Sequence, residues 1–313
     1  MKFANLLLII IIGTISLYAI LLIISDFTML SNKIINFKTQ FIPLILLLVP
    51  CGWLALYVRW NLLIKNSDIR VPFRKNLEIY LAGFTLSITP GKVGELIRSQ
   101  ILKTKFGIPR TKTASLVLVE KLYDLVGAVA TSITGIWLFH EAGYVIMMAF
   151  ALLIVIFILI SSRRFFNKFI NWSHRFRIMS NFLQPLSESY EVIRNSTRGK
   201  IVILASLLSV AYWLITSLAV YFVLLAFGIN LNYLSVVSTF TASLILGAAS
   251  FIPGGIGVAE GSLVGLFSLQ GIAVSSSLIL VILIRIFTLW YGVTIGFIAL
   301  KLSGVFSIKS PSI

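Results

Sequence analysis

Nine charged residues stand within or beside long apolar stretches of this chain, and their side chains need partners. The set comprises Arg59, Lys92, Glu95, Arg98, Glu120, Lys121, Asp124, Glu260 and Arg285. A charge at the centre of an apolar membrane helix costs about 2.5 to 3.5 kcal/mol, so such residues face a protein interior or a water cavity and pair with one another. Basic side chains placed in this way suit a phosphate or another anion. We take seven as candidate substrate-binding residues: Lys92, Glu95, Arg98, Glu120, Asp124, Glu260 and Arg285.

The spacing of these charges predicts some of their partners. Glu120 and Asp124 are four residues apart and share one helix face, where they repel unless a cation lies between them or one is protonated. Arg285 is our candidate for that cation. Arg59 lies close to the end of an apolar run, and we expect its side chain to extend to the interface rather than to bind substrate.

Two apolar stretches, 77–102 and 234–271, are interrupted by proline and glycine. Proline removes a helical donor and glycine permits a sharp reversal, so each stretch is predicted to dip into the membrane and turn back. Glu95 and Glu260 follow these turns. They can stabilise the positive end of the returning helix, or they can help free backbone amides to bind an anionic head group. The backbone positions predicted to matter are Pro90, Gly91, Gly94, Pro253, Gly254, Gly255 and Gly257.

The composition excludes an ordinary soluble domain. Of 313 residues, 58% are apolar and 12% are charged, and the mean hydropathy is +1.02. Soluble domains carry about 25% charged residues. The single cysteine, Cys51, and the two histidines, His140 and His174, exclude a disulfide framework and give no metal centre. We expect an all-α integral membrane protein without cofactor or metal and without a nucleic-acid partner.

Six stretches are long enough to cross a membrane, which takes about 20 apolar residues. They are 3–25, 41–64, 113–139, 144–162, 201–227 and 274–300. With both interrupted stretches treated as re-entrant, the segments on the side of the N-terminus carry 19 basic residues and the opposite segments carry two, Lys33 and Lys38. Because cytoplasmic loops are enriched in Lys and Arg, both termini are predicted to be cytoplasmic, in the cytoplasmic membrane.

The order of elements predicts an inverted repeat. Residues 1–141 and 142–313 each contain two spans, a Pro-Gly hairpin and one further span. Three crossings per half place the second half upside down relative to the first, an arrangement typical of transporters with a binding site near the bilayer midplane. The basic segment 163–200 carries aromatic residues at helical spacing, as in a helix lying on an anionic leaflet. The four-residue spacing of Gly257, Gly261 and Gly265 predicts close approach of another helix.

Four motifs resemble the lysylphosphatidylglycerol synthase transmembrane region family across almost the whole chain. They are Ser-Ile-Thr-Pro-Gly-Lys-Val-Gly-Glu-Leu-Ile-Arg at 87–98, Glu-Lys-Leu-Tyr-Asp at 120–124, Phe-Ile-Pro-Gly-Gly-Ile-Gly-Val-Ala-Glu at 251–260, and the stretch 285–290. The resemblance implies a flippase-like protein that moves a lipid-linked head group across the membrane. No aminoacyl-transferase domain follows within these residues, so we expect no synthase activity.

We therefore expect translocation of an anionic phospholipid or polyprenyl-phosphate head group through a polar cavity between the repeats, and no enzyme activity. Glu260→Gln and Arg285→Ala should each lower translocation without loss of folding. One alternative is an accessory subunit of a lipid or glycan synthesis pathway; a membrane lipid phosphatase or glycosyltransferase is another. Membrane lipids are the expected partners, with a second copy of the chain or a synthase left open.

Overall fold

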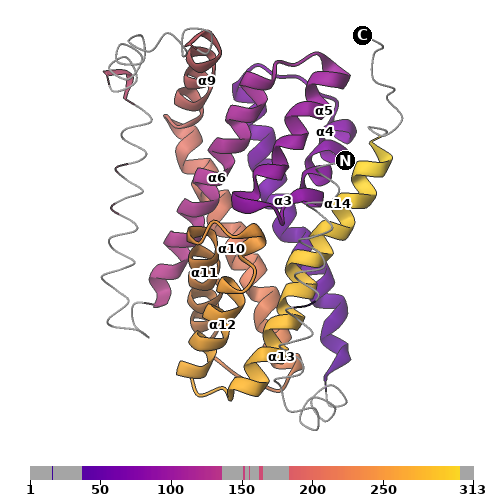
Figure 1. Ribbon diagram of the computed structural model, residues 1–313, viewed down its shortest axis with the longest axis vertical. Helices are drawn as coiled ribbons and strands as arrows, with labels where there is room; N and C mark the ends of the chain where they lie inside the picture. The colour runs from indigo at the N-terminus through magenta and orange to yellow at the C-terminus, as the bar shows by residue number, and fades with distance from the viewer. Residues whose placement is uncertain are drawn as a thin grey trace.

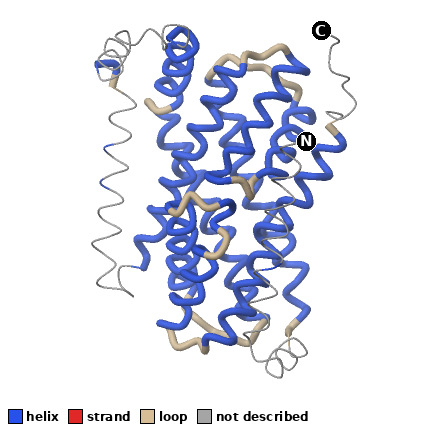
Figure 2. Tube along the Cα trace, viewed as in Figure 1, coloured by secondary structure: helices blue, strands red, loops and turns tan. Residues whose placement is uncertain are grey.

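The computed structural model describes residues 37–135 and 183–303, together with the single residues 16, 151, 155 and 162–164. The described segments are helices and connecting turns (Figure 1, Figure 2). Three helical stretches within them are long and apolar enough to cross a membrane: Thr39–Asn66, Lys200–Ala226 and Val274–Leu302. They coincide with the predicted spans 41–64, 201–227 and 274–300, so the prediction of an all-α membrane protein is confirmed.

The helices of the first described segment are α3 (Ile42–Asn66), α4 (Phe73–Ala82), α5 (Ile97–Phe106) and α6 (Arg110–Ser132). Those of the second are α9 (Leu183–Ser196), α10 (Lys200–Ala226), α11 (Tyr233–Ala249), α12 (Val258–Leu269), α13 (Val274–Arg285) and α14 (Tyr291–Leu302). Helices α3, α6 and α10 pack on one another along the centre of the molecule. Large side chains of α3 and α6, such as Trp60, Leu63 and Tyr123, are fully buried.

Both predicted Pro-Gly interruptions break a helix. Between α4 and α5 the chain forms two 3₁₀ segments, η2 (Gly83–Leu86) and η3 (Pro90–Leu96); between α11 and α12 it forms η6 (Pro253–Gly255). Thr89 is extended, as the residue before a proline prefers, and Gly254 adopts a left-handed φ of 63°.

The two breaks meet at mid-height of the molecule. Segments η3 and η6 are in contact, and a Cβ placed on Gly254 would lie 3.5 Å from the carbonyl oxygen of Ile88 (Figure 1). The α4–α5 and α11–α12 hairpins thus approach each other tip to tip from opposite ends. That each hairpin returns to the membrane face it left stays a prediction.

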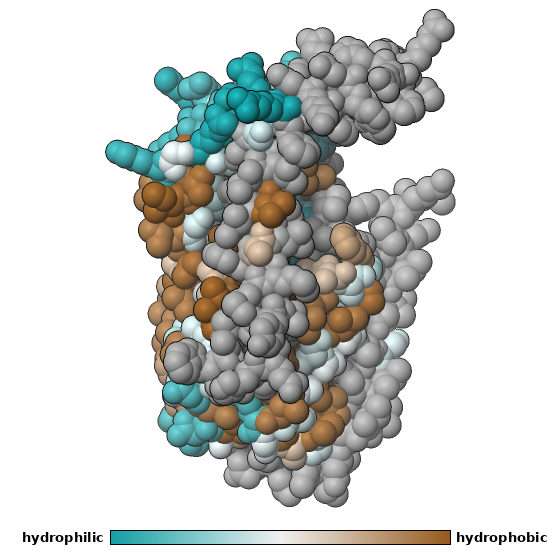
Figure 3. All heavy atoms as spheres, turned by 90° about the vertical axis from the view of Figure 1, so that its left-hand side faces the viewer, coloured by the Kyte–Doolittle hydropathy of each residue, from teal (hydrophilic) through white to brown (hydrophobic). Residues whose placement is uncertain are grey.

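The basic connections gather at one end of the bundle. Asn66 donates to the carbonyl oxygen of Asn195, Lys105 donates to that of Ser303, and Thr111 bonds Glu188, which ties the predicted cytoplasmic segments together. At the opposite end, the Lys38 amide donates to the carbonyl of Ala226. In Figure 3 the coloured surface is hydrophilic at the upper end and mostly hydrophobic below it, with smaller hydrophilic patches toward the lower end, as a membrane belt between two polar ends requires.

Several sequence predictions fall outside the described residues. They are the span 3–25, the span 144–162 apart from single residues, the end of the span 113–139, the boundary at 141, and the aromatic residues of 165–176. The inverted repeat is therefore still a prediction.

The prediction that the spaced glycines of α12 seat another helix is wrong for the described part of the chain. A Cβ placed on Gly261 or Gly265 meets no atom within 4 Å. The close approach occurs elsewhere. On α14, a Cβ at Gly296 would lie 2.4 Å from the backbone nitrogen of Thr85 and 2.8 Å from the carbonyl carbon of Phe84, so this glycine lets α14 cross η2.

This difference gives a matched pair of variants. Gly296→Ala should lower the free energy of unfolding by about 1 to 3 kcal/mol, because the neighbouring atoms are backbone and cannot move aside cheaply. Gly261→Ala, also inside a helix but in open space, should raise it by about 0.5 to 1 kcal/mol through better helix propensity. Unfolding of the purified protein in mixed detergent micelles measures both; equal stability of the two variants would contradict the packing described here.

Candidate functional site

Six charged side chains form a closed ring of alternating sign between helices α3, α5 and α6 and segment η3. Around the ring, the ion pairs are Arg59–Asp124 at 2.6 Å, Asp124–Lys121 at 3.2 Å, Lys121–Glu95 at 2.7 Å, Glu95–Arg98 at 3.1 Å, Arg98–Glu120 at 2.7 Å and Glu120–Arg59 at 3.7 Å. Three cations balance three carboxylates, and each carboxylate contacts two cations. We call this set the charge ring. It has no net charge, which lowers the cost of burying it in an apolar bundle.

One side of the ring, which we call the dry side, is buried in the protein, whereas the other side is partly exposed. Arg59, Arg98 and Glu120 are almost fully buried, whereas the Lys121 and Asp124 side chains are 24% and 15% exposed. On the dry side, the Arg98 guanidinium stacks over the rings of Trp60, at 4.6 Å, and Tyr80, at 4.9 Å. Aromatic faces stabilise a desolvated guanidinium, so these rings hold Arg98 in place.

The interpretation of Arg59 as an interfacial side chain is wrong. Arg59 is 1% exposed, and its guanidinium bonds the Ser209 hydroxyl at 2.6 Å and Asp124 at 2.6 Å. The cation expected between Glu120 and Asp124 is Arg59, not Arg285. The helix packing explains this: α3 contacts α6, which carries both carboxylates, whereas α13, which ends at Arg285, packs against α12, which carries Glu260.

Arg285 instead forms a second buried ion pair. Its Nε lies 2.8 Å from Oε1 of Glu260, and both residues are at most 5% exposed. The other oxygen of Glu260 accepts a hydrogen bond of 2.7 Å from the Gly257 amide, which caps the start of α12. Glu260 therefore has the helix-start role that its position allowed, and it also fixes Arg285. Nη2 of Arg285 is buried without a hydrogen-bond partner in the described chain.

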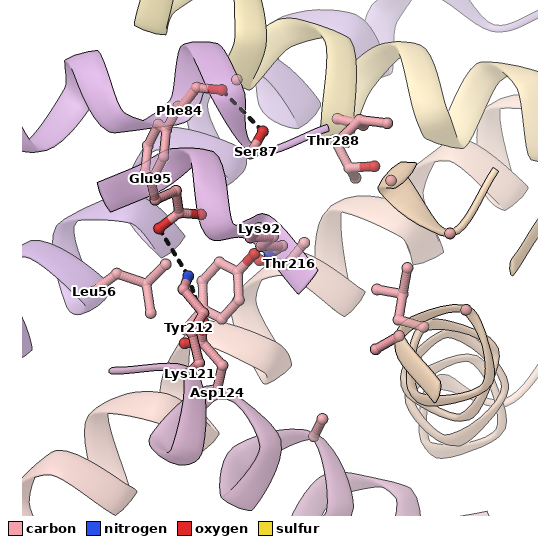
Figure 4. Close-up of a pocket in the computed structure, with 18 of the residues that line it drawn as sticks. Leu56, Phe84, Ser87, Lys92, Glu95, Lys121, Asp124, Tyr212, Thr216 and Thr288 are labelled. Atoms are coloured by element: carbon pink, nitrogen blue, oxygen red, sulfur yellow. Dashed lines mark hydrogen bonds and ion pairs between the residues drawn. The ribbon is translucent and has the colours of Figure 1, made fainter. Parts of the chain in front are cut away.

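A cavity of about 440 Å³ lies between the charge ring, the Arg285–Glu260 pair and the two hairpin tips. Five of the seven predicted substrate-binding residues line it: Lys92, Glu95, Glu120, Asp124 and Arg285. The other two, Arg98 and Glu260, stand behind this wall and hold Glu95, Glu120 and Arg285. Figure 4 shows Glu95 and Lys121 pointing toward one another at the polar side of the cavity.

Among the cations that line the cavity, Lys92 is the one that forms no ion pair with a described carboxylate. No ion pair or hydrogen bond joins its side chain to the described residues, although it lines the same cavity as Glu95 and Asp124 and lies close enough to both to interact electrostatically. Its backbone has a φ of 55°, in the left-handed region that residues with a Cβ rarely adopt. Because the ring and the Arg285–Glu260 pair are each neutral, Lys92 gives the site a net positive charge.

The hairpin positions predicted from sequence shape the backbone around the cavity. Gly94 is required for packing, since a Cβ there would lie 2.5 Å from Cβ of Leu86, and its amide donates to Thr89 at 2.6 Å. The remaining positions set the turns: Pro90 and Gly91 begin η3, Pro253 begins η6, and Gly254, Gly255 and Gly257 have positive φ.

The similarity to known proteins agrees with this architecture. Residues 6–296 match the family described as lysylphosphatidylglycerol synthase TM region. The chain belongs to this family. Relatives include a UPF0104 membrane protein of Methanocaldococcus jannaschii, 26% identical over 219 residues that cover 68% of this chain and 91% of the relative. A UPF0104 membrane protein of Pyrococcus horikoshii is 24% identical over 286 residues, 82% of this chain and 85% of the relative. No solved structure shows a significant match.

In this member of the lysylphosphatidylglycerol synthase TM region family, two features of the site were not predicted from sequence: the place of Arg59 and Lys121 in the site, and a break in the last span. Arg59 and Lys121 complete the charge ring, and the sequence signal for both was their position inside predicted spans. The last span is also interrupted by a π-helical segment, Ile286–Trp290, immediately after Arg285. Such segments are frequent at functional sites, and they leave no simple trace in hydrophobic periodicity.

Proposed function

We propose that this protein translocates an anionic lipid head group across the cytoplasmic membrane, and that the head group binds in the cavity between the two hairpin tips. The observation that carries the proposal is the excess positive charge of that cavity. Lys92 forms no ion pair with a described carboxylate, and Arg285 lines the same cavity with a guanidinium whose buried Nη2 has no described hydrogen-bond partner. A phosphate group supplies acceptors for both donors.

The position of the cavity supports transport rather than surface binding. It lies where two broken helices of the membrane bundle meet, as transporter sites commonly do. In the predicted inverted repeat, each hairpin would limit access to the site from one face of the membrane. The basic end of the bundle would then face the cytoplasm, with both termini on that side.

The charge ring favours binding over acid–base chemistry. Each of its three carboxylates contacts two cations, so none is a free base aimed into the cavity. Glu260 is likewise held by Arg285 and the Gly257 amide. We therefore propose a translocator without a covalent step. An accessory role in lipid or glycan synthesis is the second candidate, and copurification of a stoichiometric synthase would favour it.

Neutralising Lys92 tests the proposal. In proteoliposomes that hold head-group-labelled phospholipids or short polyprenyl phosphates, Lys92→Gln should reduce the translocation rate of an anionic lipid about tenfold, because one charge-assisted hydrogen bond is lost. Lys92→Arg should retain most of the rate. Lys75→Gln is the matched control, because Lys75 pairs with Glu78 at an exposed position outside the cavity.

If wild type moves no lipid of the panel faster than empty liposomes, the proposal fails. If it transports and Lys92→Gln does so equally well, the cavity charge is not the determinant.

A further inference from the structure

The cavity has an apolar, exposed part to its lining in addition to the charged residues. Among the described residues that line it, only Ala248, Phe251 and Ile252 are exposed, and all three are apolar. Phe251 is 78% exposed and Ile252 is 41% exposed. They lie within five residues of one another, at the end of α11 and in the turn before η6. We call these three residues the apolar mouth.

An opening of this kind faces hydrocarbon more favourably than water. The mouth lies at a hairpin tip, at mid-height of the bundle (Figure 1), and the coloured surface between the two ends of the molecule is mostly hydrophobic (Figure 3). A mouth used by a water-soluble anion would need polar groups to replace its hydration as it enters. The charged wall and the apolar mouth together match an amphiphile with an anionic head and a hydrocarbon chain.

The backbone at Phe251 adds a second, independent observation. Its φ is 55°, a left-handed conformation that glycine or asparagine adopts with little strain and a bulky residue does not. Of the three described non-glycine residues with positive φ, two are Lys92 and Phe251, one at each hairpin break. Strain of this kind is found at binding sites and switch regions, where the side chain has a use that the fold alone does not require.

We propose that the apolar mouth is a lateral portal through which the hydrocarbon chain of the substrate stays in the bilayer while its head group occupies the cavity. This inference rests on the proposed function and adds the position of the lipid's hydrocarbon chain during transport. It names Phe251 as the residue that contacts the chain, with Ala248 and Ile252 beside it. A lipid with a long chain is then the substrate, and a free phosphate compound is not.

Photocrosslinking tests the portal independently of transport. The full chain carries p-benzoylphenylalanine at position 251 or, as the control, at 297, since Phe297 is also exposed, at 58%, but lies outside the cavity lining. Proteoliposomes contain tail-tagged phosphatidylglycerol or tail-tagged phosphatidylcholine. At 251, the yield for the anionic lipid should exceed that for the zwitterionic lipid at least about fivefold, and Lys92→Gln should remove this preference. At 297, the two yields should be equal.

Equal yields for the two lipids at 251 would overturn the portal, even if the protein transports lipid. A preference at 251 that is absent at 297 would support it, even if wild type shows no net transport in the same vesicles. The portal and the proposed function can therefore fail separately.

A pair of substitutions at Phe251 provides the second measurement. Phe251→Asn suits the left-handed backbone but is polar, so it should fold at least as stably as wild type and transport at least about fivefold more slowly. Phe251→Leu keeps the apolar surface and should transport within about twofold of wild type. If the Phe251→Asn protein transports lipid at the wild-type rate, the portal is contradicted.

Discussion

Replacing Arg98 with glutamine should lower the free energy of unfolding by about 3 to 5 kcal/mol, because it removes one partner from a buried set of ion pairs. Arg98 is 1% exposed and contacts two carboxylates of the charge ring, Glu95 at 3.1 Å and Glu120 at 2.7 Å. Its loss leaves three buried carboxylates with two cations. The midpoint and slope of unfolding in mixed detergent micelles measure the change.

A double variant shows whether the loss of stability comes from the unpaired charge or from the missing Arg98 side chain. Arg98→Gln combined with Glu120→Gln leaves two cations and two carboxylates, so the ring is neutral again. The double variant should be more stable than Arg98→Gln alone, with a coupling energy of about 0.5 to 3 kcal/mol. Lys75→Gln, which breaks only the exposed pair with Glu78, should cost less than about 1 kcal/mol. An Arg98→Gln protein as stable as the Lys75→Gln control would show that the ring does not form.

The second large effect concerns Arg285 and Glu260. The structure revises the expectation that their single variants keep normal folding. Because the two residues are a buried pair at 2.8 Å, Glu260→Gln or Arg285→Ala leaves one buried charge alone and should cost about 3 to 5 kcal/mol of stability. Low transport by either single variant would therefore have two explanations.

The double variant Glu260→Gln with Arg285→Gln removes that ambiguity. No charge is left unpaired, and the glutamine at 260 can still accept the Gly257 amide, so most of the stability should return. Transport of an anionic lipid should stay at least about tenfold below wild type, because the Arg285 donor in the cavity is gone. Recovery of both stability and transport would show that the pair is structural only.

The sequence was most informative where a residue broke a local rule. Pro90 and Pro253 inside apolar stretches predicted the two helix breaks, and charges inside spans predicted which residues would gather. Five of the seven predicted side chains line one cavity, and the other two support it. These predictions follow from local chemistry: proline cannot continue a helix, and a buried charge must find a partner.

The pairing itself could not be read from one sequence. Arg59 pairs with Asp124, which is 65 residues away in the chain, and Arg285 pairs with Glu260 rather than with Glu120 because of how α13 packs. Register between helices far apart in the chain sets both partners. The exposure of Phe251 and the π segment after Arg285 also depend on tertiary packing, and neither disturbs the hydrophobic pattern.

The most direct test of the central claim is the head-group selectivity of transport. Two labelled lipids with the same acyl chains, phosphatidylglycerol and phosphatidylcholine, are compared in proteoliposomes of wild type and of Lys92→Gln. Wild type should move the anionic lipid at least about tenfold faster than the zwitterionic one, and Lys92→Gln should bring the ratio close to one. A wild-type ratio near one, or a ratio that Lys92→Gln leaves unchanged, would contradict a cavity built to bind an anionic head group.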